Sequence, residues 1–259
     1  MGKFDKILIC TDWDGTLFYN QTVSNENINA IKYFQQNGGF FTVCSGRYFE
    51  FLRKFENLVH PNTYTACYNG GLIIDIDKMD VLYEAFCDDY MFELVDKVLK
   101  LNIPIIGINV YDSIRKFPVE YTVEEYLREL PELKKQKHYK ILLKTNTPKN
   151  GIRLSRLANK LDLGDYIAVR SWNVSLEIMK RSNAKGEALK RIAEAIGAKL
   201  TIGIGNYEND IELLTAADIG YAVGDSPEIV KKAADRITVS ASESAVAKII
   251  YQIEKELRA

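Results

Sequence analysis

The strongest constraint on the fold of this 259-residue chain is its alternation of short apolar runs with segments of helical periodicity. Each run is rich in β-branched residues and ends at glycine or polar residues, as buried strands do. This alternation is typical of a parallel sheet with helices on both faces, because a parallel connection must cross the sheet. We therefore expect an α/β protein whose parallel sheet contains residues 7–11, 40–44, 65–68, 200–204 and 219–223.

Two of the expected helices have clear terminal signals. Ser24 precedes apolar residues at helical spacing and Gly38 follows them, so a helix should lie between these two residues. Ser242 stands in the same way before Val246, Ile250 and the other apolar residues of a last helix. We expect Ser24 and Ser242 to cap these helices.

Residues 84–180 differ in pattern from both flanks and indicate a second α/β unit. Three of the expected sheet strands precede this segment and two follow it. The whole chain is also longer than a usual single domain of about 100–200 residues. The sequence therefore predicts a core made of residues 1–83 and 181–259, interrupted by an inserted domain of residues 84–180.

The composition limits the classes of partner. Thirty-four Lys and Arg residues against 35 Asp and Glu residues give a formal charge of −1, so we expect no nucleic-acid or membrane partner. No apolar run approaches the roughly 20 residues of a membrane span, and the first residues lack the layout of a signal peptide. We expect a cytoplasmic protein that acts on a small molecule. The four cysteines form no CxxC pair, which argues against a zinc site or a disulfide framework.

Polar residues follow four of the expected strands, at the edge of the sheet where ligands of open α/β folds bind. Asp12 and Asp14 come after the first strand, and two carboxylates this close are costly unless a cation or a shared proton offsets their repulsion. A hard divalent ion such as Mg²⁺ takes oxygen ligands of this kind. The alternative is a plain turn or a helix cap.

Two further groups in the chain suit an anion. Ser45 and the amide of Gly46 offer a hydroxyl and an N–H at the mouth of a strand-to-helix turn, although the same pair also suits an ordinary turn. Lys185 opens an amphipathic helix, where its charge opposes the helix dipole and favours a nearby anion. The alternative for Lys185 is a solvated surface lysine.

The segment GIGNYEND follows the fourth expected strand. It has Gly203 and Gly205 but Glu208 in place of the third glycine of a dinucleotide-binding GxGxxG motif, so we exclude that function. Its oxygen-bearing side chains can instead supply the far side of a metal site.

Taken in order, DWDGT, SGR, the lone lysine of AKGEALKRI and GNYEND resemble the motifs of the haloacid dehalogenase superfamily of phosphatases. The resemblance covers nearly the whole chain and is closest to the Cof-type branch, often called sugar phosphatases. SWNVSLEIM, shortly before AKGEALKRI, is similar to the return from cap to core in that branch. The resemblance implies a three-layer, Rossmann-like parallel-sheet core with an inserted α/β cap domain.

The resemblance also implies catalytic roles. Asp12 would be the nucleophile that forms an aspartyl-phosphate, and Asp14 the general acid and base. Ser45 and Lys185 would bind the phosphoryl oxygens. The amides near Gly15 and Gly46 would assist them.

A Mg²⁺ cofactor is implied in the same way. Its ligands would be Asp12, the backbone carbonyl of Asp14 and the side chain of Asn206. Asp210 would lie in the first or second metal shell and orient Lys185 or metal-bound water, and Asn209 would hold the same loop. Asn206 departs from most members, which have Asp there, so the resemblance implies a lowered affinity for Mg²⁺.

Candidate substrate contacts in the cap lie just before the return to the core. They are Arg170, Trp172, Asn173 and Glu177. The alternatives are that Trp172 packs in the cap interior and that Arg170 pairs with a neighbouring acid.

The leading functional hypothesis is a Mg²⁺-dependent phosphatase acting on a small phosphorylated metabolite, with a sugar phosphate favoured by the resemblance. One alternative is a phosphomutase on the same fold. Another is a phosphometabolite-binding protein without turnover, which Asn206 favours and the intact pair of Asp12 and Asp14 disfavours. We expect a monomer or a weak homodimer.

Overall fold

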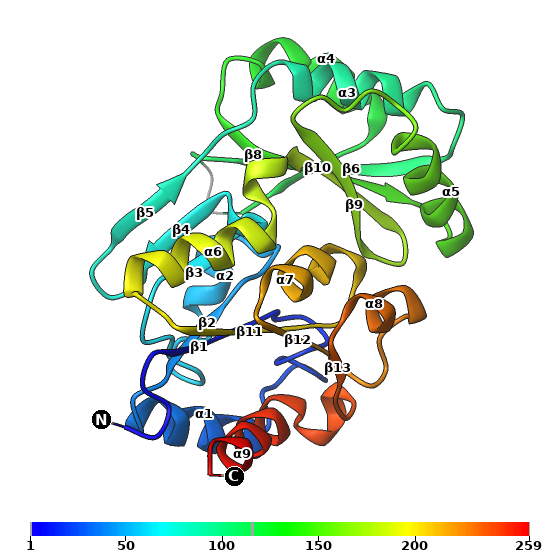
Figure 1. The fold of residues 1–259 in the computed structure, drawn as a ribbon. Coiled ribbons are helices and arrows are strands. Elements are labelled where there is room, and N and C mark those ends of the chain that lie inside the picture. The colour runs from blue at the N-terminus through cyan, green and yellow to red at the C-terminus, as the bar shows by residue number, and fades with distance from the viewer. Residues whose placement is uncertain (1, 115–116, 259) are drawn as a thin grey trace.

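The computed structural model describes residues 2–114 and 117–258 and contains three β-sheets in those residues (Figure 1). The first, here called the parallel sheet, has the strand order β13-β12-β11-β1-β2, with every neighbouring pair parallel. Its strands are β1 (Ile7–Thr11), β2 (Phe40–Val43), β11 (Leu200–Gly205), β12 (Ile219–Ala222) and β13 (Arg236–Ile237).

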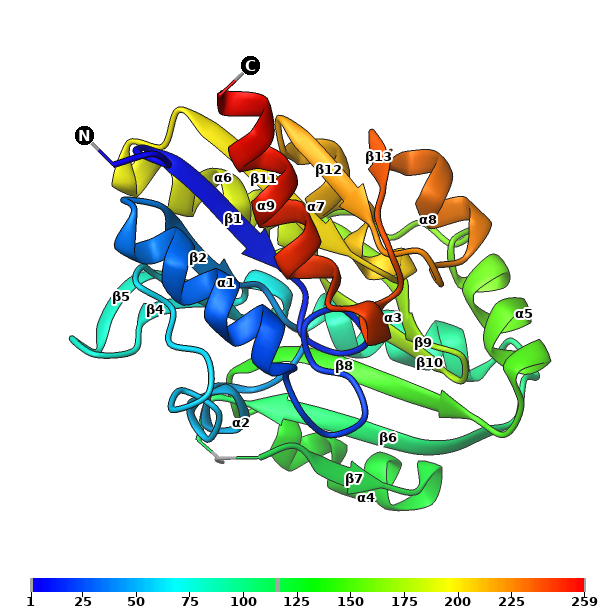
Figure 2. The same ribbon diagram turned by 90° about the horizontal axis from the view of Figure 1, so that it is seen from below.

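The side chains of β1 show how helices cover both faces of the parallel sheet. Ile7 and Ile9 pack in one cluster with residues of α1 (Asn25–Gln36) and α9 (Ala245–Leu257). Leu8 and Cys10 point to the other face and pack with residues of α6 (Lys185–Ile196) and α7 (Ile211–Ala216). Figure 2 shows α1 and α9 together on the near face of the strands. The expected three-layer α/β core is therefore confirmed. The shorter core helices are α2 (Phe49–Arg53) and α8 (Glu228–Ala233).

One expected strand of the parallel sheet makes most of its pairing in another sheet. The predicted run 65–68 forms β3 (Thr65–Cys67), which pairs antiparallel with β4 (Leu72–Asp75) in a separate sheet that continues into β5 (Asp80–Glu84). The connection of only four residues makes β3 and β4 a hairpin, and a single parallel bridge, between Cys44 and Ala66, joins β3 to the end of β2. The fifth parallel strand is instead β13, whose two residues are too few to give a sequence pattern.

The segment between β5 and α6 builds a second five-stranded sheet, here called the cap sheet, with the order β7-β6-β8-β10-β9 and antiparallel pairing throughout. Its strands are β6 (Ile105–Asp112), β7 (Val119–Tyr121), β8 (His138–Thr145), β9 (Tyr166–Trp172) and β10 (Ser175–Lys180). The helices of this segment are α3 (Tyr90–Leu99), α4 (Val123–Leu133) and α5 (Pro148–Ala158).

Strand β8 shows the two faces of the cap sheet. Ile141 and Leu143 pack with residues of α3 and α5 in the apolar interior of the cap. Leu142 and Lys144 point the other way and line a cavity shared with the core. In Figure 1 the cap sheet stands over the core on the side of α6 and α7. An α/β core with a cap is thus confirmed, while the boundaries at residues 83/84 and 180/181 stay a prediction.

The last helix is capped differently from the prediction. Ser24 caps α1 as expected, its Oγ accepting from the amide of Asn27 at 3.2 Å. Ser242 does not cap α9, because a 3-10 helix over Ala241–Glu243 intervenes and α9 begins at Ala245. The amide of Ala247, in the first turn of α9, donates instead to Oδ1 of Asn27 at 2.9 Å. A buried side chain of α1 thereby takes the role of the missing cap.

No helix in the part of the chain that the structure describes has the length and apolar character needed to cross a membrane.

We expect Asn27→Ala to lower the free energy of unfolding by about 1–3 kcal/mol, because the buried amide of Ala247 would lose its acceptor. Urea unfolding at neutral pH measures this change. Glu26→Ala is the matched control, since the Glu26–Lys248 ion pair is about half exposed and worth at most about 0.5–1 kcal/mol. Equal losses in the two variants would contradict the role given to Asn27.

Candidate active site

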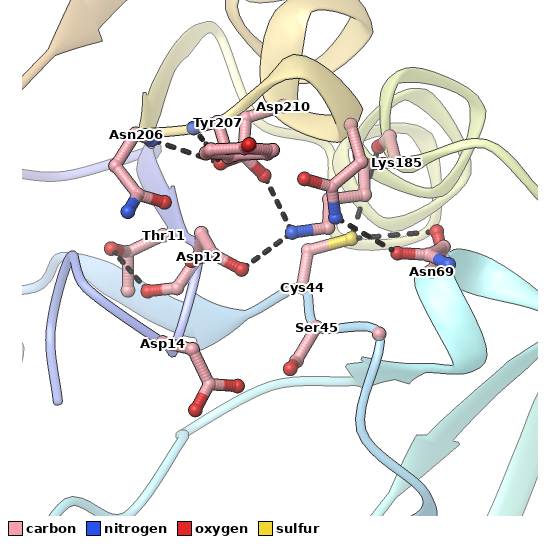
Figure 3. A network of polar contacts seen from close by, with 12 residues as sticks. Thr11, Asp12, Asp14, Cys44, Ser45, Asn69, Lys185, Asn206, Tyr207 and Asp210 are labelled. Carbon is pink, nitrogen blue, oxygen red and sulfur yellow. Dashed lines mark hydrogen bonds and ion pairs between the residues drawn. The ribbon is translucent and has the colours of Figure 1, made fainter. Parts of the chain in front are cut away.

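Lys185 joins two buried carboxylates at the carboxyl edge of the parallel sheet. Its Nζ donates to Oδ1 of Asp12 and to Oδ1 of Asp210, both at 2.5 Å (Figure 3). All three side chains are nearly inaccessible to solvent. Three of the predicted site residues, from segments far apart in the sequence, are thus brought into direct contact.

Each of these three side chains is placed by the end of a regular element. Asp12 follows β1, whose register next to β11 also directs its amide to the carbonyl of Ile204 at 2.8 Å. Lys185 is the first residue of α6. Asp210 comes shortly after β11, and its Oδ2 accepts from the amides of Asn206 and Tyr207, both at 2.9 Å. Both oxygens of Asp210 are therefore used to fix the loop after β11 and to orient Lys185.

The cluster contains two carboxyl groups, Asp12 and Asp210, but only one basic group, Lys185. Burial and the neighbouring charge of Asp210 raise the pKa of Asp12 to about 7, although Lys185 acts in the opposite direction. Burial alone would lower the pKa of Lys185, but the two carboxylates outweigh it and raise that pKa, so Lys185 keeps its proton. One cation thus faces two carboxylates, and a further cation near Asp12 would be stabilised.

The donor set near Asp12 fits a hard metal ion. Within residues 2–114 and 117–258, no hydrogen bond occupies Oδ2 of Asp12 or the side-chain oxygen of Asn206. Asn206 and Asp12 line the same cavity, and in Figure 3 the Asn206 amide lies on the side of Asp12 away from Lys185. Among the described residues no group of three or more His, Cys, Asp or Glu side chains is arranged to hold a metal. The predicted ligand set is not a group of this type, because it combines one carboxylate with a side-chain amide and a backbone carbonyl.

Asp14 is held away from this cluster by Arg47, which the predicted site does not include. Arg47 Nε and Nη2 donate to the two oxygens of Asp14, both at 2.8 Å. Figure 3 shows the Asp14 carboxylate directed away from the contacts of Lys185. The sequence signal that could have pointed to Arg47 as a site residue is its position in SGR, two residues after Ser45. A bidentate pair of this kind is a strong, directional contact even where it is partly exposed.

Ser45 and Gly46 lie at the end of β2, beside Asp12 and Asp14. Ser45 is buried, and its Oγ accepts from the amide of Arg47 at 3.1 Å. The predicted helix after this turn is α2, which has only five residues, so a helix dipole adds little here. Ser45 itself is a candidate donor, beside Lys185, to an anion bound at Asp12.

A cavity of about 720 Å³ lies between the parallel sheet and the polar face of the cap sheet. The predicted site residues on its wall are Asp12, Asp14, Gly15, Gly46, Trp172, Glu177, Asn206 and Asn209. Trp172 is 56% exposed, so it does not pack in the cap interior. The wall also contains Tyr111 and Lys144 of the cap sheet, which the predicted site does not include.

Arg170 and Asn173 connect cap and core. Arg170 donates to Oε1 of Glu208 at 2.6 Å and to the hydroxyl of Tyr207 at 2.7 Å, and that hydroxyl donates to Oδ1 of Asn173 at 3.0 Å. In the described residues these two side chains are not on the cavity wall. The structure therefore shows the alternative interpretation of Arg170, in which this residue pairs with an acid, here Glu208.

Comparison with known proteins identifies the family. The sequence profile of the haloacid dehalogenase-like hydrolases matches residues 9–250. The chain belongs to this family. The resemblance inferred from the four motifs is confirmed, and the chain is a haloacid dehalogenase-like hydrolase.

Several relatives of this hydrolase match it over almost their entire length. Phosphatase YwpJ of Bacillus subtilis is 28% identical, over 95% of this chain and 99% of the relative. The 5-amino-6-(5-phospho-D-ribitylamino)uracil phosphatase YcsE of the same organism is 26% identical, with 94% of each chain covered. A haloacid dehalogenase-like hydrolase from Bacteroides thetaiotaomicron has a similar structure, with a TM-score of 0.71, 25% identity and coverage of 96% and 99%.

The raised pKa of Asp12 leads to a prediction for stability without divalent metal. Between pH 3.8 and about 7 the folded hydrolase binds more protons at this carboxyl than the unfolded chain does, so its free energy of unfolding should fall as the pH rises through this range. Asp12→Asn removes the group, and its stability should therefore fall less than that of the wild type between pH 5 and 8. Urea unfolding in the presence of a chelator measures the difference.

Asp5→Asn is the control for this prediction, because Asp5 is exposed and its variant should follow the wild type. Identical pH dependences for the wild type and Asp12→Asn would contradict the prediction.

Proposed function

We propose that this hydrolase is a Mg²⁺-dependent phosphatase that cleaves a small phosphorylated metabolite through an aspartyl-phosphate at Asp12. The observation that carries the proposal is the buried Asp12 carboxylate, held on one oxygen by Lys185 and open on the other toward a cavity of metabolite size. The names of the relatives, which are phosphatases, support the same chemistry.

In the first step, Oδ2 of Asp12 attacks the phosphorus atom in line with the leaving alkoxide. Lys185 orients the nucleophile through the other oxygen and supplies positive charge to the phosphoryl group. The hydroxyl of Ser45 and the amides near Gly15 and Gly46 donate to the phosphoryl oxygens. These groups are fixed in advance by the ends of β1 and β2, so little reorganisation accompanies the reaction.

Asp14 acts as the proton donor to the leaving group and then as the base for the water that hydrolyses the aspartyl-phosphate. This role requires Asp14 to leave Arg47, since both of its oxygens now accept from that guanidinium. Arg47 is therefore the group that holds Asp14 in its resting position.

When bound, Mg²⁺ supplies positive charge to the phosphoryl group and to Asp12. The residues that would hold it are Asp12, Asp14 through its backbone carbonyl, and Asn206. Asp210 would serve from the second shell, because its carboxylate is already used by Lys185 and by the amides of Asn206 and Tyr207.

A sugar phosphate or a sugar-derived phosphate is the proposed substrate class. YcsE is named for a ribitylamino phosphate, and a structural neighbour with a TM-score of 0.75 and 17% identity is named a sugar phosphatase. In this chain the cavity beyond Asp12 carries polar groups that suit hydroxyls, such as Lys144, Ser171 and Asn209.

The test is release of inorganic phosphate from a panel of sugar phosphates, nucleotides, phosphorylated cofactors and p-nitrophenyl phosphate, with Mg²⁺ and with a chelator. We expect turnover that requires Mg²⁺ and falls by at least about 10³-fold in Asp12→Asn. Glu26→Ala, remote from the cavity, is the control and should retain activity. Turnover only with a bisphosphate activator would favour a phosphomutase, and no release from any compound by folded wild-type protein would overturn the proposal.

Asn206 gives a second prediction. Asn206→Asp should tighten Mg²⁺ binding by about tenfold, because a full negative charge in a half-buried site is worth at least about 1.4 kcal/mol to a divalent cation. Titration of activity with Mg²⁺ and calorimetry both measure this change. Asn102→Asp, an exposed site in the cap, is the control. Unchanged or weaker Mg²⁺ binding in Asn206→Asp would count against ligation at this position.

A further inference from the structure

An ion pair between Lys140 and Glu177 is buried where the cap sheet meets the core. Lys140 lies on β8 and Glu177 on the neighbouring strand β10, with 2.8 Å between Nζ and Oε1. Their side chains are only 1% and 3% exposed. Taking two such charges out of water is expensive, and an apolar pair of similar size would often be at least as stable. A contribution to stability therefore does not by itself explain why this pair is buried here.

Each partner also makes a hydrogen bond to the core, Lys140 at the loop that follows β2 and Glu177 at the turn that follows β3. Lys140 Nζ donates to the carbonyl of Gly46 at 2.8 Å. Glu177 Oε2 accepts from Nδ2 of Asn69 at 2.5 Å. The backbone N–H of Asn69 donates to the backbone carbonyl of Ser45 at 2.8 Å. The cap thus holds the loop at two successive carbonyls, directly at Gly46 and through Asn69 at Ser45.

The peptide group between Gly46 and Arg47 is fixed at both ends by these contacts. Its carbonyl accepts from Lys140, and its N–H donates to Oγ of Ser45 at 3.1 Å. Because Ser45 Oγ accepts this bond, the hydroxyl hydrogen of Ser45 is left to donate elsewhere. One peptide group therefore holds Ser45 Oγ as an acceptor and leaves its hydroxyl hydrogen available, directly before Gly46 on the cavity wall.

Glycine at position 46 allows this close approach. A Cβ atom there would lie 3.1 Å from Oδ1 of Asn69 and 3.2 Å from Nζ of Lys140, tighter than ordinary contact. The absence of a side chain at position 46 thus leaves room for Lys140 Nζ and the Asn69 side chain beside the loop.

We propose that Lys140 and Glu177 are positioning residues, through which the cap sets the orientation of the Gly46–Arg47 peptide and so directs the Ser45 hydroxyl toward a bound phosphoryl group. The proposal rests on the phosphatase function proposed above. It follows that the phosphoryl-binding loop is complete only when the cap sheet is seated on the core.

The experiment compares Lys140→Met with the double variant Lys140→Met/Glu177→Met, which removes both charges and leaves neither partner buried alone. The measurements are the affinity for inorganic phosphate with Mg²⁺ present, by calorimetry, and kcat for the best substrate. We expect both to fall about 10- to 100-fold in each variant, the usual range for a residue that orients a directly binding group. Lys140→Arg, which can still donate to both oxygens, should recover part of the loss.

Lys100→Met is the matched control, because Lys100 also belongs to the cap but forms an exposed ion pair with Asp96. It should bind phosphate and turn over as the wild type does. Thermal unfolding of every variant separates loss of fold from loss of function.

A double-mutant cycle with Ser45→Ala tests the route of the effect. If Lys140 acts through the Ser45 hydroxyl, Lys140→Met should cost at most about twofold in phosphate affinity once that hydroxyl is absent. Full additivity of the two losses would overturn the proposal. So would wild-type phosphate affinity in a folded double variant, which would make the pair purely structural.

These outcomes are distinct from failure of the proposed function. A wild-type protein that binds phosphate but releases none from any substrate would refute the phosphatase, while the phosphate affinities would still decide the role of Lys140. A wild-type protein that binds no phosphate would overturn both.

Discussion

The contact of Lys185 with Asp12 and Asp210 is the constraint on which the rest of the site depends. It joins the end of β1 to the start of α6 and the loop after β11, two segments that the chain reaches only after passing through the whole cap. A buried carboxylate pair would repel without the lysine, and a buried lysine would lose its proton without the carboxylates. The order of strands in the parallel sheet, with β1 beside β11, is what brings these charges together.

The cap contributes to the site through the alternation of its strands. On β8, Ile141 and Leu143 belong to the apolar interior, whereas Lys140, Leu142 and Lys144 face the core. The same sheet therefore closes its own core with one face and supplies charged and polar groups to the cavity with the other. On the core side, the loops after β2 and β11 receive these groups, through Gly46 and through Tyr207 and Glu208.

Much of the core could be predicted from local patterns, and the rest could not for identifiable reasons. The strands and the polar residues after them follow from short-range sequence, and the edge of a parallel sheet brings Asp12 and Asp210 together without further information. Strand β13 is too short to give a pattern, and the antiparallel pairing of β3 with β4 was missed because the turn between them was not recognised as a hairpin. Lys140 and Gly46, 94 residues apart, meet only through the docking of two sheets, and no local pattern encodes that contact.

The pairing of charges around the cavity would favour a bound cation near Asp12. Glu177 has Lys140 and Asp14 has Arg47, but Asp12 and Asp210 share the single charge of Lys185. The cluster around Asp12 is therefore short of one positive charge before any substrate enters, and burial makes this deficit costly. A phosphoryl group adds further negative charge at the same place. Under the proposed function, positive charge beyond that of Lys185 would stabilise both the nucleophile and the phosphoryl group, and the open oxygens of Asp12 and Asn206 would bind the cation that supplies it.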